Sequence, residues 1–157
     1  MAYKQILPLQ NLNFQMNRVL THGEEACREE ELLEIAPKLQ EFDPTVWFEQ
    51  WNMLAQRAER DGRLMHAAYY HRMSEFFLPN GVPEKDEAYE SFSQCFYAAT
   101  EGENLELFDI PYEGYELPAI RLKAKEEKGV VLLHGGFDSF IEEFYLYLRE
   151  FPAAGYR

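Results

Sequence analysis

The spacing of apolar residues changes near Asn104, and this change limits the folds that the chain can adopt. Before Asn104, apolar residues recur every three or four positions, which is the period of an amphipathic helix. After it, they alternate with polar residues, which is the period of a half-buried strand. We therefore expect an α/β protein with an all-α domain over residues 1–103 and a sheet-containing domain over residues 104–157.

The helical half contains recognisable helix boundaries. Asp43-Pro44 places an N-capping residue before a proline at the first helical position, and Asp61-Gly62 ends the helix that follows. A second helix is expected from Leu64 to Phe77, so that the two helices form an antiparallel hairpin. Two further helical segments are expected, one over residues 24–39 that Pro37 divides and one from after Pro83 to the Glu101-Gly102 turn.

The strand-forming half begins with two alternating segments, Leu105–Ile110 and Tyr115–Ala124. A turn at Tyr112-Glu113-Gly114 joins them into an antiparallel hairpin. The wholly apolar run Val130–Leu133 predicts a central strand that is covered on both faces. A glycine-rich turn follows, and helical periodicity over Phe140–Phe151 predicts the first crossover helix toward a parallel neighbour.

This order of elements resembles the opening of the α/β-hydrolase fold, in which a Val/Leu-rich strand ends in a turn like His134-Gly135-Gly136. The preceding helices, with Trp47 and Trp51, resemble the N-terminal helical domain of the esterase FrsA-like and 2,6-dihydroxypseudooxynicotine hydrolase-like branch. The resemblance implies a cap-like helical domain and the N-terminal part of a hydrolase domain. In that branch the helical domain helps to cover the substrate pocket, which makes some aromatic side chains candidates to line it: Trp47, Trp51, Tyr69, Tyr70, Phe76 and Phe77.

The His-Gly-Gly turn has a chemical role in the resembling family. Its glycines let the backbone approach a reacting carbonyl and point N–H groups at the oxygen that becomes negative. By resemblance, the amide of Gly136 or Phe137 contributes to this oxyanion hole, while His134 and Gly135 are structural residues of the turn.

The sequence contains no Gly-x-Ser-x-Gly motif, which a serine nucleophile on a strained strand-to-helix turn requires. Ser139 follows the wrong strand and is expected to cap the next helix, with Glu142 at capping-box spacing. No histidine follows His134. We therefore expect the N-terminal segment of a serine hydrolase of ester or related carbonyl bonds, C–C bonds included. Its Ser-Asp-His triad would lie beyond Arg157, so this segment would be inactive alone.

No metal or cofactor site is expected from the sequence. His66 and His71 are five positions apart, rather than at the four-residue spacing of a metal-binding pair on a helix. His22, beside two glutamates, is a single strong nitrogen ligand. Cys27 and Cys95 have no zinc-site spacing, and we expect two buried thiols.

Charge and hydropathy limit the partners and the location. The chain has 15 Lys and Arg against 28 Asp and Glu, a formal net charge of −13, which disfavours nucleic acids and anionic membranes. The first twenty residues lack the unbroken apolar stretch of a signal peptide, so a cytoplasmic location is expected. The expected partners are a small-molecule substrate in the complete protein and a second copy of the chain, held through the incompletely paired sheet edge. The alternative to this association is partial disorder after about Asn104.

An alternative is a non-enzymatic binding module, because the helical hairpin over residues 47–77 resembles a tetratricopeptide-type pair. Helical repeats need about three units to bury a continuous core. The sequence offers one pair, without a copy at fixed period, and this alternative does not explain the strand-forming half.

Overall fold

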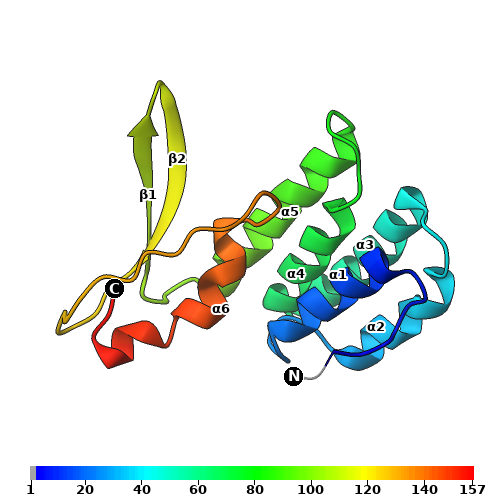
Figure 1. The fold of residues 1–157 in the computed structure, drawn as a ribbon, viewed down its shortest axis with the longest axis horizontal. Helices are drawn as coiled ribbons and strands as arrows, with labels where there is room; N and C mark the ends of the chain where they lie inside the picture. The colour runs from blue at the N-terminus through cyan, green and yellow to red at the C-terminus, as the bar shows by residue number, and fades with distance from the viewer. Residues whose placement is uncertain (1–2) are drawn as a thin grey trace. The chain divides into compact units, whose positions relative to one another are not determined.

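Helices make up the first of two units in the computed structural model, which describes residues 3–157. This unit is Met1–Ala99, and the second unit is Thr100–Arg157, which contains a two-stranded antiparallel sheet (Figure 1). The chain is therefore a mixed α/β chain. Over residues 3–157, no helix has both the length and the apolar character needed to cross a membrane.

In the helical unit, α4 packs against both α3 and α5, and α1 and α2 complete the unit (Figure 1). Its central position explains why α4 has no exposed face from His66 onward. The elements are α1 Gln10–Thr21, α2 Glu29–Ile35, the 3-10 turn η1 Ala36–Lys38, α3 Pro44–Arg60, α4 Leu64–Glu75 and α5 Pro83–Ala99.

The predicted boundaries of α3 are confirmed. Its N-cap is Asp43, whose carboxylate accepts hydrogen bonds from the amides of Thr45 at 2.8 Å and Val46 at 3.2 Å. The helix ends at Arg60, and Gly62 follows with a φ of +70°, a backbone conformation that L side chains rarely adopt. The helix expected over residues 24–39 is shorter than predicted, because α2 begins at Glu29.

The aromatic core lies between α3 and α4. Trp47, Trp51 and Tyr70 are each at most 1% exposed. The Trp47 indole N–H donates to the carbonyl of Met73 at 2.6 Å, which joins α3 to the end of α4. Phe77 packs edge-on against Trp47 at a ring distance of 5.0 Å. These aromatic side chains therefore form the core of the helical unit.

Helix α1 was not predicted from the sequence. Its N-cap, Leu9, makes no capping hydrogen bond through its side chain. The helix instead buries two amide side chains, Asn13 and Asn17. Asn13 accepts from the amides of Ile6 at 2.8 Å and Leu7 at 2.9 Å, and Asn17 accepts from the amide of Lys4 at 2.7 Å. The two asparagines thus satisfy the polar backbone of the segment before the helix.

In the second unit, the predicted hairpin is confirmed. Strand β1 is Leu105–Tyr112 and β2 is Tyr115–Leu122, paired antiparallel from Leu105↔Leu122 to Tyr112↔Tyr115. The two turn residues, Glu113 and Gly114, have φ values of +48° and +86°. Positive φ at both central residues is the signature of the type I′ turn that suits the twist of a two-residue hairpin.

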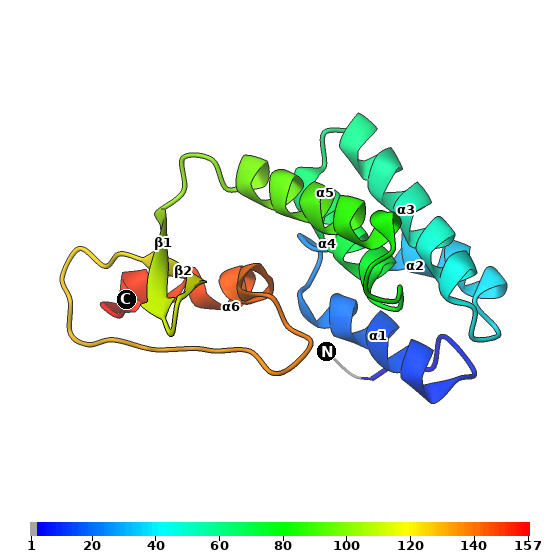
Figure 2. The same cartoon turned by 90° about the horizontal axis from the view of Figure 1, so that it is seen from above.

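The predicted central strand Val130–Leu133 is wrong as a description of this structure. The segment runs without regular secondary structure (Figure 2), and its side chains are between 39% and 84% exposed. An interior strand needs partners at both edges and cover on both faces. Within residues 3–157 this segment has one backbone partner, the stretch 155–157, to which it is joined by a single parallel bridge between Gly129 and Tyr156.

The bonds on either side of that bridge nevertheless follow a parallel pattern. The amide of Lys128 donates to the carbonyl of Gly155 at 2.8 Å, and the amide of Val131 donates to that of Arg157 at 2.8 Å. In return, the amide of Arg157 donates to the carbonyl of Gly129 at 3.2 Å. The chain therefore leaves residue 131, crosses over and returns beside the same segment in the same direction.

The predicted crossover helix Phe140–Phe151 is also wrong, because three short pieces replace it: η2 Ile141–Phe144, α6 Tyr145–Leu148 and η3 Phe151–Ala154. Pro152, which has no amide hydrogen, lies in the first turn of η3, so the hydrogen-bond ladder of α6 does not continue through it. At the start, the carboxylate of Glu143 accepts from the amide of Phe140 at 2.8 Å. This N-terminal bond lies one residue later than the predicted Ser139–Glu142 box.

Candidate functional site

The predicted site residues His134, Gly135, Gly136 and Phe137 form one exposed loop (Figure 2). The loop begins three residues after the 128–131 segment, which pairs in parallel with residues 155–157. In open parallel sheets, ligands bind at the carboxyl ends of strands. The loop thus lies at the end of the segment where such chemistry is expected.

Gly135 is required by packing. A Cβ atom at this position would lie 2.7 Å from the Cβ of Ser139 and 3.1 Å from Cε2 of Phe144. Real Cβ atoms essentially never approach another atom within 3.0 Å, so a side chain at position 135 would force its neighbours to shift. Neither Gly135 nor Gly136 has a positive φ, so close approach, rather than an unusual backbone conformation, explains the glycine at 135.

Gly136 and Phe137 face open space. A Cβ atom on Gly136 would meet nothing within 4 Å, and the Phe137 side chain is fully exposed. Within residues 3–157, the amides of Gly136 and Phe137 donate no hydrogen bond. Two adjacent donors without an internal acceptor can bind an acceptor on another molecule.

The side chain of His134 is exposed and turns back on the loop. Its Nδ1 lies 3.1 Å from the carbonyl oxygen of Gly135, and it makes no hydrogen bond to Ser139 within the described part of the chain. A histidine that acts as a base needs a nucleophile within hydrogen-bond reach. The loop therefore contains donors for an anion but no assembled nucleophile and base.

An apolar cavity of about 240 Å³ lies between the hairpin and the 130–132 segment. It is formed by side chains of β1, β2, the extended segment and the short helices, and the loop residues 134–137 do not line it. Its lining includes Phe108, Ile120, Leu122, Val130, Leu132 and Tyr156.

The other histidines lie in the helical unit. His66 is buried, its Nε2 is 2.8 Å from the carbonyl of Glu24, and its Nδ1 is 2.7 Å from the guanidinium of Arg63. Burial lowers the pKa of His66 below its ordinary value, so the ring is neutral at pH 7. The ring of His22 packs on that of Tyr69 at 4.7 Å. These contacts give His66 and His22 structural roles in the helical unit.

The structure also brings together three residues that sequence spacing did not connect. Glu59, His71 and Cys95 each offer a donor atom, and these atoms lie within 4.8 Å of one another. Each residue comes from a different helix, so the sequence contains no local motif for the group. Both cysteines of the chain are buried and free, as predicted.

Comparisons with known proteins found a relative and a structural neighbour, whereas no family model matches the chain. The chain is 30% identical over 170 residues to a protein named Hydrolase LUC6 from Fusarium sp, with 91% of this chain and 40% of the relative covered. A solved structure titled AbyA5 Wildtype superposes with a TM-score of 0.72 at 19% identity, and the match covers 94% of this chain and 43% of that one. The chain thus spans about two fifths of the length of both proteins. Together, these similarities indicate a hydrolase-type fold.

Proposed function

We propose that the chain is the N-terminal part of an α/β-hydrolase of the esterase FrsA-like and 2,6-dihydroxypseudooxynicotine hydrolase-like branch. The complete protein would cleave ester or related carbonyl bonds, C–C bonds included, through a Ser-Asp-His triad in residues that follow Arg157. Residues 1–103 would serve as the cap-like helical domain, and the loop at residues 134–137 would supply the oxyanion hole. The proposal rests chiefly on the two unpaired amides of Gly136 and Phe137 at the end of a parallel-paired segment.

Three further observations support this function. The hairpin, the extended segment and the returning stretch follow one another in the order expected from the resemblance. The chain is similar to a relative named as a hydrolase. Finally, the exposure of Phe137 leaves room for a substrate carbonyl beside its amide.

The oxyanion role can be tested by removing one donor without removing its residue. In the longer protein, Phe137→Pro eliminates the amide hydrogen, while the matched Phe137→Ala keeps it and removes only an exposed ring. Loss of one oxyanion donor is expected to lower kcat by about 10² to 10³. The assay would use short p-nitrophenyl esters, followed by a C–C bond substrate if the esters are not turned over.

The kcat of the Phe137→Ala variant should stay within a few-fold of the wild-type value, because this variant retains the backbone N–H donor. Equal losses in the two variants would show that the side chain, rather than the amide, carries the effect. Equal activity in both would remove this amide from the oxyanion hole. Circular dichroism and thermal unfolding would establish that the proline variant keeps its fold.

The 157-residue chain alone is expected to turn over no ester. Negative charge cannot develop beside Gly136 and Phe137 without an attacking group, and the sequence has no nucleophile elbow. Measurable turnover that survives Ser139→Ala and His134→Ala substitutions would contradict the assignment of the triad to later residues.

A further inference from the structure

We propose that Glu59, His71 and Cys95 form a binding site for a divalent cation of the zinc class. The three residues come from α3, α4 and α5, and one donor atom from each lies within 4.8 Å of the other two. The site lies in the helical unit, so the proposal does not depend on the hydrolase function. A carboxylate, an imidazole and a thiol are the three side-chain types that zinc prefers.

The positions of the donor atoms are close to those that a zinc ion requires. Zinc–ligand distances of about 2.0 to 2.3 Å place tetrahedral ligands roughly 3.3 to 3.8 Å apart. The Nε2 atom of His71 now lies 2.5 Å from Oε1 of Glu59, so these two atoms would separate by about 1 Å. The other two pairs are at most 4.8 Å apart and would need to close by about 1 Å at most.

Two of the three side chains each have a polar atom without a hydrogen-bond partner within residues 3–157. His71 is 4% exposed, and its Nδ1 atom has no partner. Cys95 is 8% exposed and donates no hydrogen bond within residues 3–157. The other thiol, Cys27, has its sulfur 3.6 Å from the carbonyl oxygen of Val19 and is satisfied there. Cys95 is therefore the cysteine whose S–H group has no hydrogen-bond acceptor within residues 3–157.

Burial and the charge of Glu59 keep the Cys95 thiol protonated in the metal-free protein. Burial, with a contribution from the charge of Glu59, raises the pKa of Cys95 to about 11. A thiol with this pKa is protonated at neutral pH and unreactive. A bound divalent cation reverses this preference, because its charge stabilises the thiolate and the thiol proton is released to solvent. The formal net charge of −13 adds a general attraction for cations.

The choice of zinc follows from the ligand set and from access. Nitrogen and sulfur donors exclude magnesium and calcium, which prefer all-oxygen sites. Glu59 is 41% exposed and opens the cluster to solvent, whereas His71 and Cys95 are buried. Three protein ligands leave a fourth position for water on the exposed side. The ion would join α3, α4 and α5 at one point.

The experiment is a titration of the 157-residue chain with Co²⁺, which substitutes for zinc and reports its ligands by absorption. Binding is expected to produce a thiolate-to-cobalt charge-transfer band and the visible bands of a tetrahedral site, both of which excess Zn²⁺ removes. Cys95→Ser should abolish the charge-transfer band, while the matched Cys27→Ser should retain it. Glu59→Gln and His71→Gln should each weaken zinc binding by about tenfold or more.

Thermal unfolding and thiol labelling provide independent readouts in case a buried variant folds poorly. Zinc at about a hundred times its Kd should raise the Tm of the wild-type chain by about 10 °C. Without denaturant, where labelling does not require global unfolding, zinc should slow alkylation of Cys95 more than that of Cys27, as mapped by mass spectrometry. The proposal is overturned if no charge-transfer band forms, if the band survives Cys95→Ser, or if zinc protects both thiols equally.

Discussion

Glu31 is a buried carboxylate on α2 that holds a polar network inside the helical core. It accepts hydrogen bonds from the Tyr70 hydroxyl at 2.6 Å and from both terminal nitrogens of Arg63 at 2.9 and 3.1 Å. Burial alone would raise the pKa of Glu31, but the hydrogen bonds from Tyr70 and Arg63 outweigh it and lower that pKa. The folded state therefore favours the charged form of this residue.

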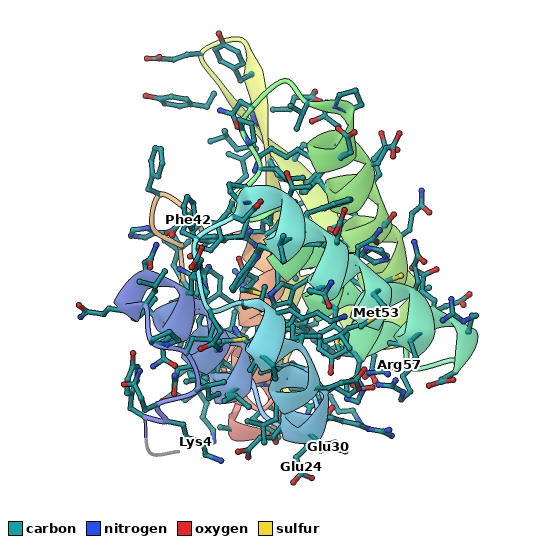
Figure 3. All side chains as sticks on the ribbon, turned by 90° about the vertical axis from the view of Figure 1, so that its right-hand side faces the viewer. Lys4, Glu24, Glu30, Phe42, Met53 and Arg57 are labelled. Carbon is teal, nitrogen blue, oxygen red and sulfur yellow. The ribbon has the colours of Figure 1, made fainter. Side chains whose placement is uncertain are left out.

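The lowered pKa makes Glu31 a source of stability that acid removes. Its contribution is fully present above the ordinary pKa of 4.5 and is lost as the pH falls through the lower pKa of the folded state. At pH 7, Glu31→Gln should reduce the free energy of unfolding by about 2 to 4 kcal/mol, measured by urea denaturation. The difference from wild type should shrink at acidic pH. Glu30→Gln, at the exposed neighbouring position (Figure 3), should change stability by about 0.5 kcal/mol or less, and an equal loss there would contradict the role of the network.

His66 adds a second acid-sensitive step at higher pH. Burial lowers its pKa in the folded state, so the unfolded chain binds a proton more readily below the ordinary value of 6.5. Stability should therefore fall as the pH drops from 6.5 through the lower pKa of the folded state. Thermal unfolding across this range should show a flatter pH dependence in His66→Gln than in wild type. If both proteins lose stability in parallel, another group is responsible.

At the scale of elements, the cap of α3 gives a direct test of a feature predicted from the sequence. Asp43→Ala removes the acceptor for the amides of Thr45 and Val46 and should destabilise the chain by about 1 kcal/mol. Glu41→Ala is the control, because it removes a nearby exposed negative charge but no cap. Chemical denaturation of both variants measures the difference. Equal values for Asp43→Ala and Glu41→Ala would assign the effect to charge alone.

The elements that could be predicted are those whose signals are local. Asp43-Pro44 starts α3, and Glu113-Gly114 supplies the two positive φ values of the hairpin turn. Helix α1 could not be found in this way, because Asn13 and Asn17 occupy buried positions where a pattern-based search expects apolar residues. Those amides are stabilised by hydrogen bonds with residues 3–7. The spacing of apolar residues gives no information about such contacts between separate segments.

Strands that depend on distant partners are equally hard to predict from a pattern. The composition of Val130–Leu133 describes a segment that pairs on both sides, yet the described residues provide one partner stretch, 155–157. The pattern did predict the direction of pairing, since the returning residues lie parallel to the segment. The composition of a segment therefore indicates that it needs neighbouring strands on both sides. Whether it forms a strand depends on whether those neighbours are present.

The two candidate sites of the molecule differ in how readily each can be recognised from the sequence. His134–Phe137 is contiguous, so a motif was sufficient to locate the loop, although the free amides of Gly136 and Phe137 required coordinates. Glu59, His71 and Cys95 meet only through the packing of α4 against α3 and α5. Sequence spacing treats these three residues as unrelated, because no single helix contains two of them.

The second unit exposes apolar side chains that a sheet would normally cover, and this predicts association of the chain with itself. Val130 is 62% and Leu132 is 84% exposed, and their backbone groups make no hydrogen bond within residues 3–157. Unpaired backbone beside apolar side chains is a template for pairing with another chain. Sedimentation velocity should therefore show an average mass that rises with protein concentration.

Lysine substitutions can locate the associating surface. Leu132→Lys places a charge on the unpaired edge and should shift the chain toward monomer, because a charged edge resists pairing. Leu33→Lys is the matched control, since Leu33 is also 51% exposed but lies on α2 in the helical unit. Association that Leu33→Lys weakens as much as Leu132→Lys would reflect general hydrophobicity. A wild-type chain with the same sedimentation coefficient at every concentration would show that this edge does not pair between copies.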